Sequence, residues 1–201
     1  TFIAPQPLPD RSLDPIGRLA VAEYLGRAGD LTTDATIPPQ TQLTAHIRAR
    51  QSGRLAGMDA ATYALKLVDA GTELELHKYD GDPLAPGDTV AVMRGSARSI
   101  LIAERTMLNF LGRLSGIATL TAQFADRIAH TQAKIVCTRK TTPGHRAVEK
   151  RAVRCGGGTS HRYGLDDPIL IKDNHIAACG SIADALQRAH AYAGHLRMIE
   201  I

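Results

Sequence analysis

The chain has 201 residues, of which 44% are hydrophobic and 22% charged, and its formal net charge at pH 7 is +4. These values are typical of a soluble globular chain with one substantial core or two smaller ones. Aromatic residues make up 4% and tryptophan is absent, which argues against a nucleic-acid-binding protein, since such proteins spread basic residues over a face and interleave aromatics.

Three cysteines are present, Cys137, Cys155 and Cys179. Their spacing matches neither a disulfide framework nor a zinc site, so we expect reduced thiols in a cytoplasmic protein. No signal-peptide pattern opens the chain, and no apolar stretch approaches the roughly 18 residues that a membrane span requires. We therefore expect neither export nor membrane insertion.

The first half of the chain predicts an α+β domain of antiparallel character. Asp14-Pro15 is a favourable helix start, and the helix that follows should end at Gly29, before the turn-like sequence GDLTTD. Alternating or apolar patterns then predict strands over 42–50, 73–78 and 88–95, with a helix over 58–70 between the first two.

The second half follows a different pattern. A long helix is predicted from Ile100 and a second one over 117–129, and a further helix is predicted over 145–154. Short apolar runs at 134–137, 169–171 and 198–201 read as strands, and an amphipathic helix over 182–193 separates the last two. Strands about 30 residues apart are typical of βα units, whose crossover connections make neighbouring strands parallel. Because a barrel needs more than three strands to close, we expect the remaining strands to lie outside these residues.

The densest chemistry lies in residues 138–175. Eight permanent cations meet only four carboxylates there: Arg139, Lys140, Arg146, Lys150, Arg151, Arg154, Arg162 and Lys172. Such a concentration on a nearly balanced protein predicts a binding site for a polyanion. Several of these cations follow predicted strands, and functional groups gather at the carboxyl ends of strands in parallel α/β folds.

Arg139 and Lys140 can both face a ligand only if their strand has already ended or bent. The TTPG sequence that follows favours such a bend. Arginine offers a planar fork for a carboxylate and lysine a point charge suited to phosphate, so the pair suggests two different anions side by side. The three glycines at 156–158 add, weakly, backbone N–H groups that can approach an anion.

Less specific interpretations compete at several positions. The basic residues of the 145–154 helix (Arg146, Lys150, Arg151 and Arg154) are more often a solvated face, with Glu149 giving local relief. His161 and Arg162 are as consistent with a surface pair as with a site. Lys172, at the end of an apolar strand, favours function. Glu200 points opposite to its apolar neighbours, toward a barrel interior, a ligand or a lysine.

Long ordered motifs then carry a family resemblance. The sequences TRKTTPG, EKRAVRCGGGTSHRYGL and ILIKDNH, with ERTMLNFLGRLSGIAT and GDLTT upstream, resemble quinolinate phosphoribosyltransferase, also named nicotinate-nucleotide pyrophosphorylase (carboxylating). The resemblance covers nearly the whole chain. It implies an α/β fold with an N-terminal α/β sandwich domain, 1–115, and the first part of an open, seven-stranded α/β barrel, 116–201.

The resemblance also implies an activity and its residues. Quinolinate and phosphoribosyl pyrophosphate would give nicotinate mononucleotide, carbon dioxide and pyrophosphate, with Mg²⁺, in a homodimer with shared sites. Residues implied in binding or catalysis are Arg105 from the partner subunit, Thr138, Arg139, His161 and Arg162 for quinolinate, Lys140 and Lys172 between the two substrates, and Glu200 for the sugar and the metal ion.

Three other functions stay open from the sequence. A related branch found in molybdenum-linked operons shares the resemblance. Lys172 could instead form a Schiff base in a barrel lyase. A non-catalytic polyanion-binding protein is the third. Since the metal-binding aspartate and the phosphate-binding loops of the family's later strands are not in this sequence, we expect no turnover from these 201 residues alone.

Overall fold

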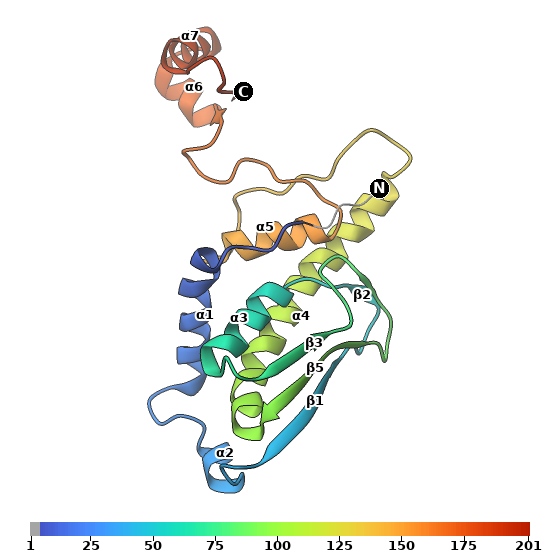
Figure 1. Cartoon of the computed structure of the whole chain (residues 1–201). Coiled ribbons are helices and arrows are strands. Elements are labelled where there is room, and N and C mark those ends of the chain that lie inside the picture. The colour runs from blue at the N-terminus through green and yellow to red at the C-terminus, as the bar shows by residue number, and fades with distance from the viewer. Residues whose placement is uncertain (1–4) are drawn as a thin grey trace. The chain divides into compact units, whose positions relative to one another are not determined.

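The computed structural model describes residues 5–201 (Figure 1). The chain divides into two compact units, Thr1–Ser160 and His161–Ile201. Both units mix helices and strands, which confirms the predicted mixed α/β class. Within the described residues, none of the helices combines the length and the apolar character that crossing a membrane requires.

A three-stranded antiparallel sheet forms one layer of the first unit. Its strands are β1 (Gln42–Arg48), β5 (Thr89–Ser96) and β3 (Glu73–Leu76), with β5 in the centre. Two short strands, β2 (Gly53–Arg54) and β4 (Pro83–Leu84), pair separately. The three longer strands confirm the prediction from sequence. Alternation predicted them because every second residue faces the helices that cover the sheet, as Ile47 does in β1.

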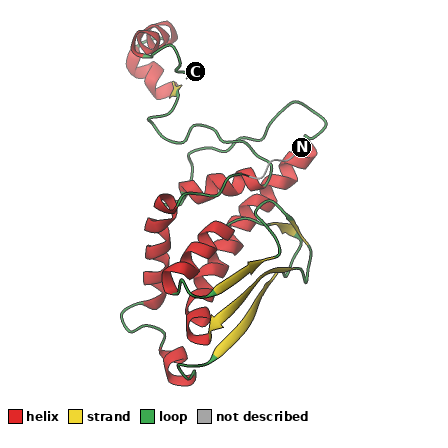
Figure 2. Cartoon of the chain, viewed as in Figure 1, coloured by secondary structure: helices red, strands yellow, loops and turns green. Residues whose placement is uncertain are grey.

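Helices form the other layer of this unit, and Figure 2 shows α3 and α4 lying across one face of the sheet. The helices of this unit, as far as its residues are described, are α1 (Asp10–Leu25), α2 (Leu31–Thr36), α3 (Met58–Val68), α4 (Ala97–Arg127) and α5 (Arg146–Cys155). Leu55, Ile100, Met107 and Leu114 are almost completely buried between the layers. Each such side chain contributes about 1.5–3 kcal/mol through removal from water.

Three predictions near the N-terminus were wrong. Helix α1 begins at Asp10, not at Asp14-Pro15, so Pro15 lies inside it, and it ends at Leu25, before the predicted end at Gly29. The missing N–H of a proline costs one hydrogen bond, and burial of Leu13 and Ile16 offsets that cost. The turn-like GDLTTD forms α2, because the side chain of Asp30 accepts the Thr33 N–H at 3.0 Å and caps the helix.

The two helices predicted from Ile100 to residue 129 are one helix of 31 residues, α4. Its buried face continues without a break through Leu114 and Ala118. Gly112 and Gly116 lie on the helix where an added Cβ would meet nothing, so they do not end it. The predicted break was wrong because a continuous buried face outweighs the low helix propensity of two glycines.

Between α4 and α5 the predicted strand at 134–137 is reduced to a single parallel bridge, Val136 with Thr159. In the second unit, β6 (Ile169–Leu170) and β7 (Ile199–Glu200) pair in parallel, as predicted for a βα unit. Between them lie α6 (Asp173–Cys179) and α7 (Ile182–Tyr192). Helix α6 was not predicted; it begins directly after Lys172, which is its N-cap.

Candidate functional site

The cationic loop of the first unit is the segment formed by residues 137–142, which precedes α5. The side-chain oxygen of Thr138 accepts the backbone N–H of Lys140 at 3.0 Å, so the chain bends directly after its one bridge. This bend is the one that the sequence predicted. Thr138 and Lys140 are exposed and Arg139 is half-buried. Within residues 5–201, the side chains of Arg139 and Lys140 make no hydrogen bond or ion pair, which leaves both cations available to a ligand.

The helix that follows this segment does not expose its charges as the sequence suggested. Glu149, Lys150 and Arg151, three consecutive charged residues of α5, are only 7%, 3% and 8% exposed. The interpretation as a solvated face was therefore wrong for Lys150 and Arg151, although Arg154 is exposed as expected. Burial at these positions is tolerated because each charge meets partners supplied by other segments.

Glu149 connects α5 to both the 137–142 segment and α4. One of its carboxylate oxygens accepts the Thr142 backbone N–H at 3.1 Å, and the other accepts two N–H groups of Arg113 at 2.5 and 3.1 Å. Arg113 also donates to the Thr142 hydroxyl at 2.5 Å. Burial alone would raise the pKa of Glu149, but the hydrogen bonds from Arg113 and Thr142 outweigh it and hold this pKa below its ordinary value.

A cavity of about 360 Å³ opens beside these groups. Its lining brings together the predicted site residues Thr138 and Lys140 with three residues that the prediction left out, Arg113, Glu149 and Lys150. The ammonium group of Lys150 also lies 2.9 Å from the sulfur of Cys137. The only sequence signal for Glu149 was its position as the lone acid in a helix of cations.

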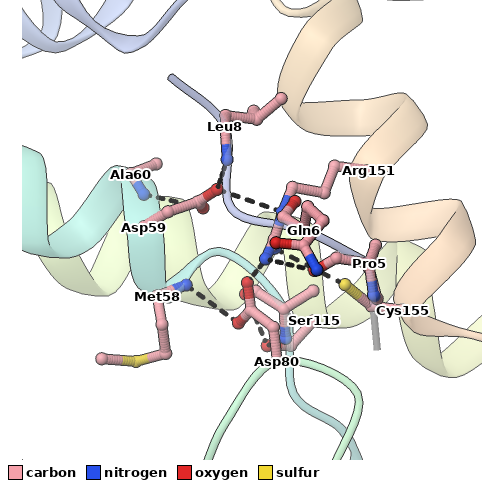
Figure 3. Close-up of polar contacts among 11 residues, drawn as sticks. Pro5, Gln6, Leu8, Met58, Asp59, Ala60, Asp80, Ser115, Arg151 and Cys155 are labelled. Carbon is pink, nitrogen blue, oxygen red and sulfur yellow. Dashed lines mark hydrogen bonds and ion pairs between the residues drawn. The ribbon is translucent and has the colours of Figure 1, made fainter. Parts of the chain in front are cut away.

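The opposite face of α5 is fixed by Arg151 (Figure 3). Its guanidinium pairs with Asp59 at 3.1 Å and with Asp80, and it donates to the backbone carbonyls of Gln6 and Pro5. Asp80 also accepts the N–H of Met58, the first residue of α3. The cluster therefore joins α5 to α3, to the loop after β3 and to the N-terminal segment.

Cys155 lies beside this cluster and is completely buried. Burial, with a smaller effect from the nearby Asp80 carboxylate, raises the pKa of its thiol to about 12. Cys137 and Cys179 are also free cysteines, and both are half-buried.

The glycines at 156–158 are not an anion cradle. Their three N–H groups already donate to carbonyls of α5, those of Ala152, Arg154 and Val153. At Gly156 and Gly158 an added Cβ would collide with α4 or with Val153. The glycines are needed for close packing of the two helices, so the weak interpretation as an anion site was wrong.

The second unit holds four more of the predicted site residues, whereas Arg105 lies on α4 of the first unit. Nε2 of His161 lies 3.2 Å from a carboxylate oxygen of Glu200, so these two candidates meet. Lys172 follows β6 directly, and Glu200 is the register partner of Leu170 in β7. Glu200 is about half exposed, with 56% of its side chain accessible.

Arg162 carries an unusual donor. Its Nη1 donates to the Pro168 carbonyl at 3.2 Å, whereas its Nε is buried and has no hydrogen-bond partner within the described part of the chain. A buried N–H without an acceptor costs about 1–3 kcal/mol.

The potential metal ligands of the described residues are their His, Cys, Asp and Glu side chains. Residues 5–201 contain no group of three or more such side chains that could hold a metal ion.

The environment of Lys172 bears on the Schiff-base alternative. Lys172 is exposed, whereas the lysines of Schiff-base enzymes are activated by desolvation or by another cation.

Both units belong to the α/β class, and several of their cations follow bends or strands: Arg139 and Lys140 follow the bridge at Val136, and Lys172 follows β6. Two family models match the chain: "Quinolinate phosphoribosyl transferase, N-terminal domain" over residues 30–115 and "Quinolinate phosphoribosyl transferase, C-terminal domain" over residues 117–201. The chain belongs to the quinolinate phosphoribosyltransferase family.

Curated relatives agree with this assignment. The chain is 47% identical over 173 residues to the "Probable nicotinate-nucleotide pyrophosphorylase [carboxylating]" of Bacillus subtilis, covering 86% of this chain and 60% of that protein. It is 45% identical to the nicotinate-nucleotide pyrophosphorylase of Mycobacterium leprae, covering 93% and 66%. The chain therefore spans about two thirds or less of the length of these relatives.

Solved structures give the same result. NadC from Streptococcus pyogenes superimposes with a TM-score of 0.92 at 39% identity, over 97% of this chain and 69% of that one. The nicotinate-nucleotide pyrophosphorylase of Francisella tularensis gives a TM-score of 0.89 at 35% identity, over 96% and 69%.

Proposed function

We propose that this chain takes part in phosphoribosyl transfer from phosphoribosyl pyrophosphate to quinolinate, with decarboxylation, as a step of NAD biosynthesis. The products are nicotinate mononucleotide, carbon dioxide and pyrophosphate. The observation that carries the proposal is the bent 137–142 segment with its two available cations, in a chain of this family. A dicarboxylate and a polyphosphate together require both a planar fork and a point charge, and Arg139 and Lys140 supply one of each.

Quinolinate would be held by Arg139, His161 and Arg162, with Thr138 nearby. The unpartnered Nε of Arg162 supports this role, because a carboxylate oxygen is the acceptor that it lacks among the described residues. Charge-assisted bonds to both carboxylates orient the ring so that its nitrogen can attack the anomeric carbon of the sugar. Orientation of this kind can contribute roughly 7–11 kcal/mol to lowering the barrier.

Lys140 and Lys172 would lie between the two substrates and stabilise the leaving pyrophosphate. Glu200 would face the positive charge that develops on the sugar, and its contact with His161 supports a link between the sugar and quinolinate subsites. Once the ring nitrogen carries the ribosyl group, the cationic ring accepts the electron pair released by decarboxylation. That step requires no separate cofactor.

Mg²⁺ fits this proposal as a partner of phosphoribosyl pyrophosphate. Mg²⁺ is commonly held by one or two carboxylates together with substrate phosphates, so Glu200 alone can be its contribution from this chain. When bound, the ion would neutralise charge on the departing pyrophosphate.

We further propose a homodimer in which Arg105 completes the partner's site. Arg105 is exposed on α4, and the apolar Leu108, Leu120 and Phe124 are exposed along the same helix at 38%, 57% and 53%. An exposed apolar face beginning near a candidate site residue supports burial against a second subunit. The free thiols support a cytoplasmic location.

For the fold, we propose that residues 116–201 begin an open, seven-stranded α/β barrel and that residues 1–115 form the sandwich domain. The parallel pair β6 and β7 with helices between them supports a barrel, and the two family models meet at the same point.

The test is calorimetric titration of the natural-length protein with quinolinate and then with nicotinate, which lacks one carboxylate. Quinolinate should bind at least tenfold more tightly, since one carboxylate held by arginine contributes about 1.5–3 kcal/mol. Equal affinities would refute the assignment of two carboxylates to Arg139 and Arg162.

The shared site is tested by mixing Arg105→Ala and Lys172→Ala proteins. Each homodimer should be inactive, whereas mixed dimers contain one intact site and should recover some activity. If activity does not return after subunit exchange, Arg105 does not act on the partner's site.

A further inference from the structure

Helix α5 holds the 137–142 segment at both ends. At the start of the segment, the ammonium group of Lys150 lies 2.9 Å from the sulfur of Cys137. At the end of the segment, Arg146 donates to the Thr141 hydroxyl at 3.2 Å, and Glu149 accepts the N–H of Thr142. Arg139 and Lys140 lie between these contacts, so the path of the backbone at the two cations depends on side chains of α5.

Arg113 joins this arrangement from α4. It donates to the Glu149 carboxylate and to the Thr142 hydroxyl, while Glu149 itself accepts the Thr142 N–H. Each of the three residues therefore contacts the other two, and both oxygens of the carboxylate are used. A closed set of charge-assisted hydrogen bonds fixes an angle as well as a distance.

The helix that carries Glu149 is itself fixed. Arg151, two residues further on, is held by Asp59 and Asp80 and by two backbone carbonyls (Figure 3). Contacts on both faces of α5 leave it little freedom to rotate or slide. The 137–142 segment is thus supported by a rigid platform, which is what a precisely oriented binding group requires.

Stability alone does not account for these buried charges. Replacement of a buried ion pair by apolar residues of similar volume is often neutral or stabilising, because the desolvation cost disappears. What an apolar replacement cannot supply is the directional contact from Glu149 and Arg113 to the backbone and hydroxyl of Thr142.

We propose that Glu149 and Arg113 are positioning residues, which hold the 137–142 segment in the shape that presents Arg139 and Lys140 to the anionic substrates. This inference rests on the function proposed above. Neither residue touches substrate in this scheme; both act through Thr142.

The experiment compares quinolinate binding to the natural-length protein with binding to Arg113→Met and Glu149→Gln variants, by calorimetry and with thermal unfolding alongside. Arg113→Met tests the inference even if Glu149→Gln does not fold, because the Arg113 side chain is 51% exposed. Each variant should raise the Kd for quinolinate about tenfold, the equivalent of one charge-assisted hydrogen bond, with unchanged binding stoichiometry.

Two controls separate positioning from general stability. Glu75→Gln breaks an exposed ion pair with Arg94 on the sheet and should leave the Kd unchanged. Thr142→Ser keeps the hydroxyl and the N–H and should behave as wild type, whereas Thr142→Val should weaken binding as Arg113→Met does. If Arg113→Met and Glu149→Gln instead show a lower binding stoichiometry and a lower Tm with an unchanged Kd, their role is merely structural and the inference is overturned.

The outcomes also distinguish the two proposals. A wild-type protein that binds no quinolinate would overturn the proposed function and this inference with it. Wild-type binding with Kd values within twofold for Arg113→Met and Glu149→Gln would overturn the inference alone.

Discussion

Replacement of Arg151 by methionine gives the sharpest test of the packing described above. The substitution keeps much of the side-chain volume but removes the guanidinium that meets Asp59, Asp80 and the carbonyls of Gln6 and Pro5. The Asp59 and Asp80 side chains are only 11% and 6% exposed, so water cannot replace the lost partner.

The expected loss in the free energy of unfolding depends on the hydrogen-bond donors that remain to the two aspartates. Among the described residues, Asp59 keeps the N–H groups of Leu8 and Ala60 as donors, whereas Asp80 keeps only the N–H of Met58. Removal of one partner of a buried ion pair costs about 3–5 kcal/mol because an uncompensated charge stays behind. For a protein of this size that loss lowers Tm by about 6–20 °C.

Urea and thermal unfolding followed by circular dichroism measure this cost. Arg154→Met is the matched control, because it lies on the same helix and is exposed, and it should change stability by less than about 0.5 kcal/mol. Addition of Asp80→Asn to Arg151→Met should restore part of the loss by removing the stranded charge. If Arg151→Met costs no more than the Arg154 control, the reasoning about buried partners is refuted.

Three further predictions concern other groups. Because the pKa of Glu149 is lowered in the folded state, its stabilisation is present above its ordinary pKa of 4.5 and is lost as pH falls through the lower folded value. In urea unfolding between about pH 6 and pH 3, wild type should thus lose stability more steeply than Glu149→Gln, and parallel curves would contradict this. Buried Cys155, whose pKa is about 12, should react with thiol reagents only after unfolding, while the two other cysteines react in the native protein. Simultaneous reaction of all three cysteines would contradict this prediction. Gly156→Ala should destabilise the fold by about 1–3 kcal/mol, since the new Cβ meets the Ala118 carbonyl. Gly112→Ala should stabilise the fold by up to about 1 kcal/mol, because its Cβ meets nothing. Equal losses of stability in the two variants would count against this packing.

Local periodicity accounts for the parts of the fold that the sequence predicted. The alternation in β1 and the parallel pairing of the apolar runs at β6 and β7 depend on a few neighbouring residues and on simple connection rules. The bend after Thr138 was also accessible, because the TTPG sequence that follows favours it. The continuity of α4 was not, since it depends on a buried face that only the packed helices define.

The buried charges of α5 were missed for a related reason. Glu149 pairs with Arg113, 36 residues away in the sequence, and Arg151 pairs with Asp80, 71 residues away. No property of the sequence EKR distinguishes a solvated face from one whose partners arrive from elsewhere in the fold. The individual roles of Arg139, Lys140, His161, Arg162, Lys172 and Glu200 stay predictions, tested by the experiments above.

The unbroken course of α4 has a consequence for how this family can vary. A helix turns by about 100° and advances about 1.5 Å with each residue, so one inserted or deleted residue between Arg105 and Arg113 would rotate one against the other by that angle. Substitutions on the exposed face leave the angle intact, but a change of length does not. We therefore expect relatives to differ in residue type at exposed positions of this segment, such as Asn109 and Gly112, and to keep its number of residues constant.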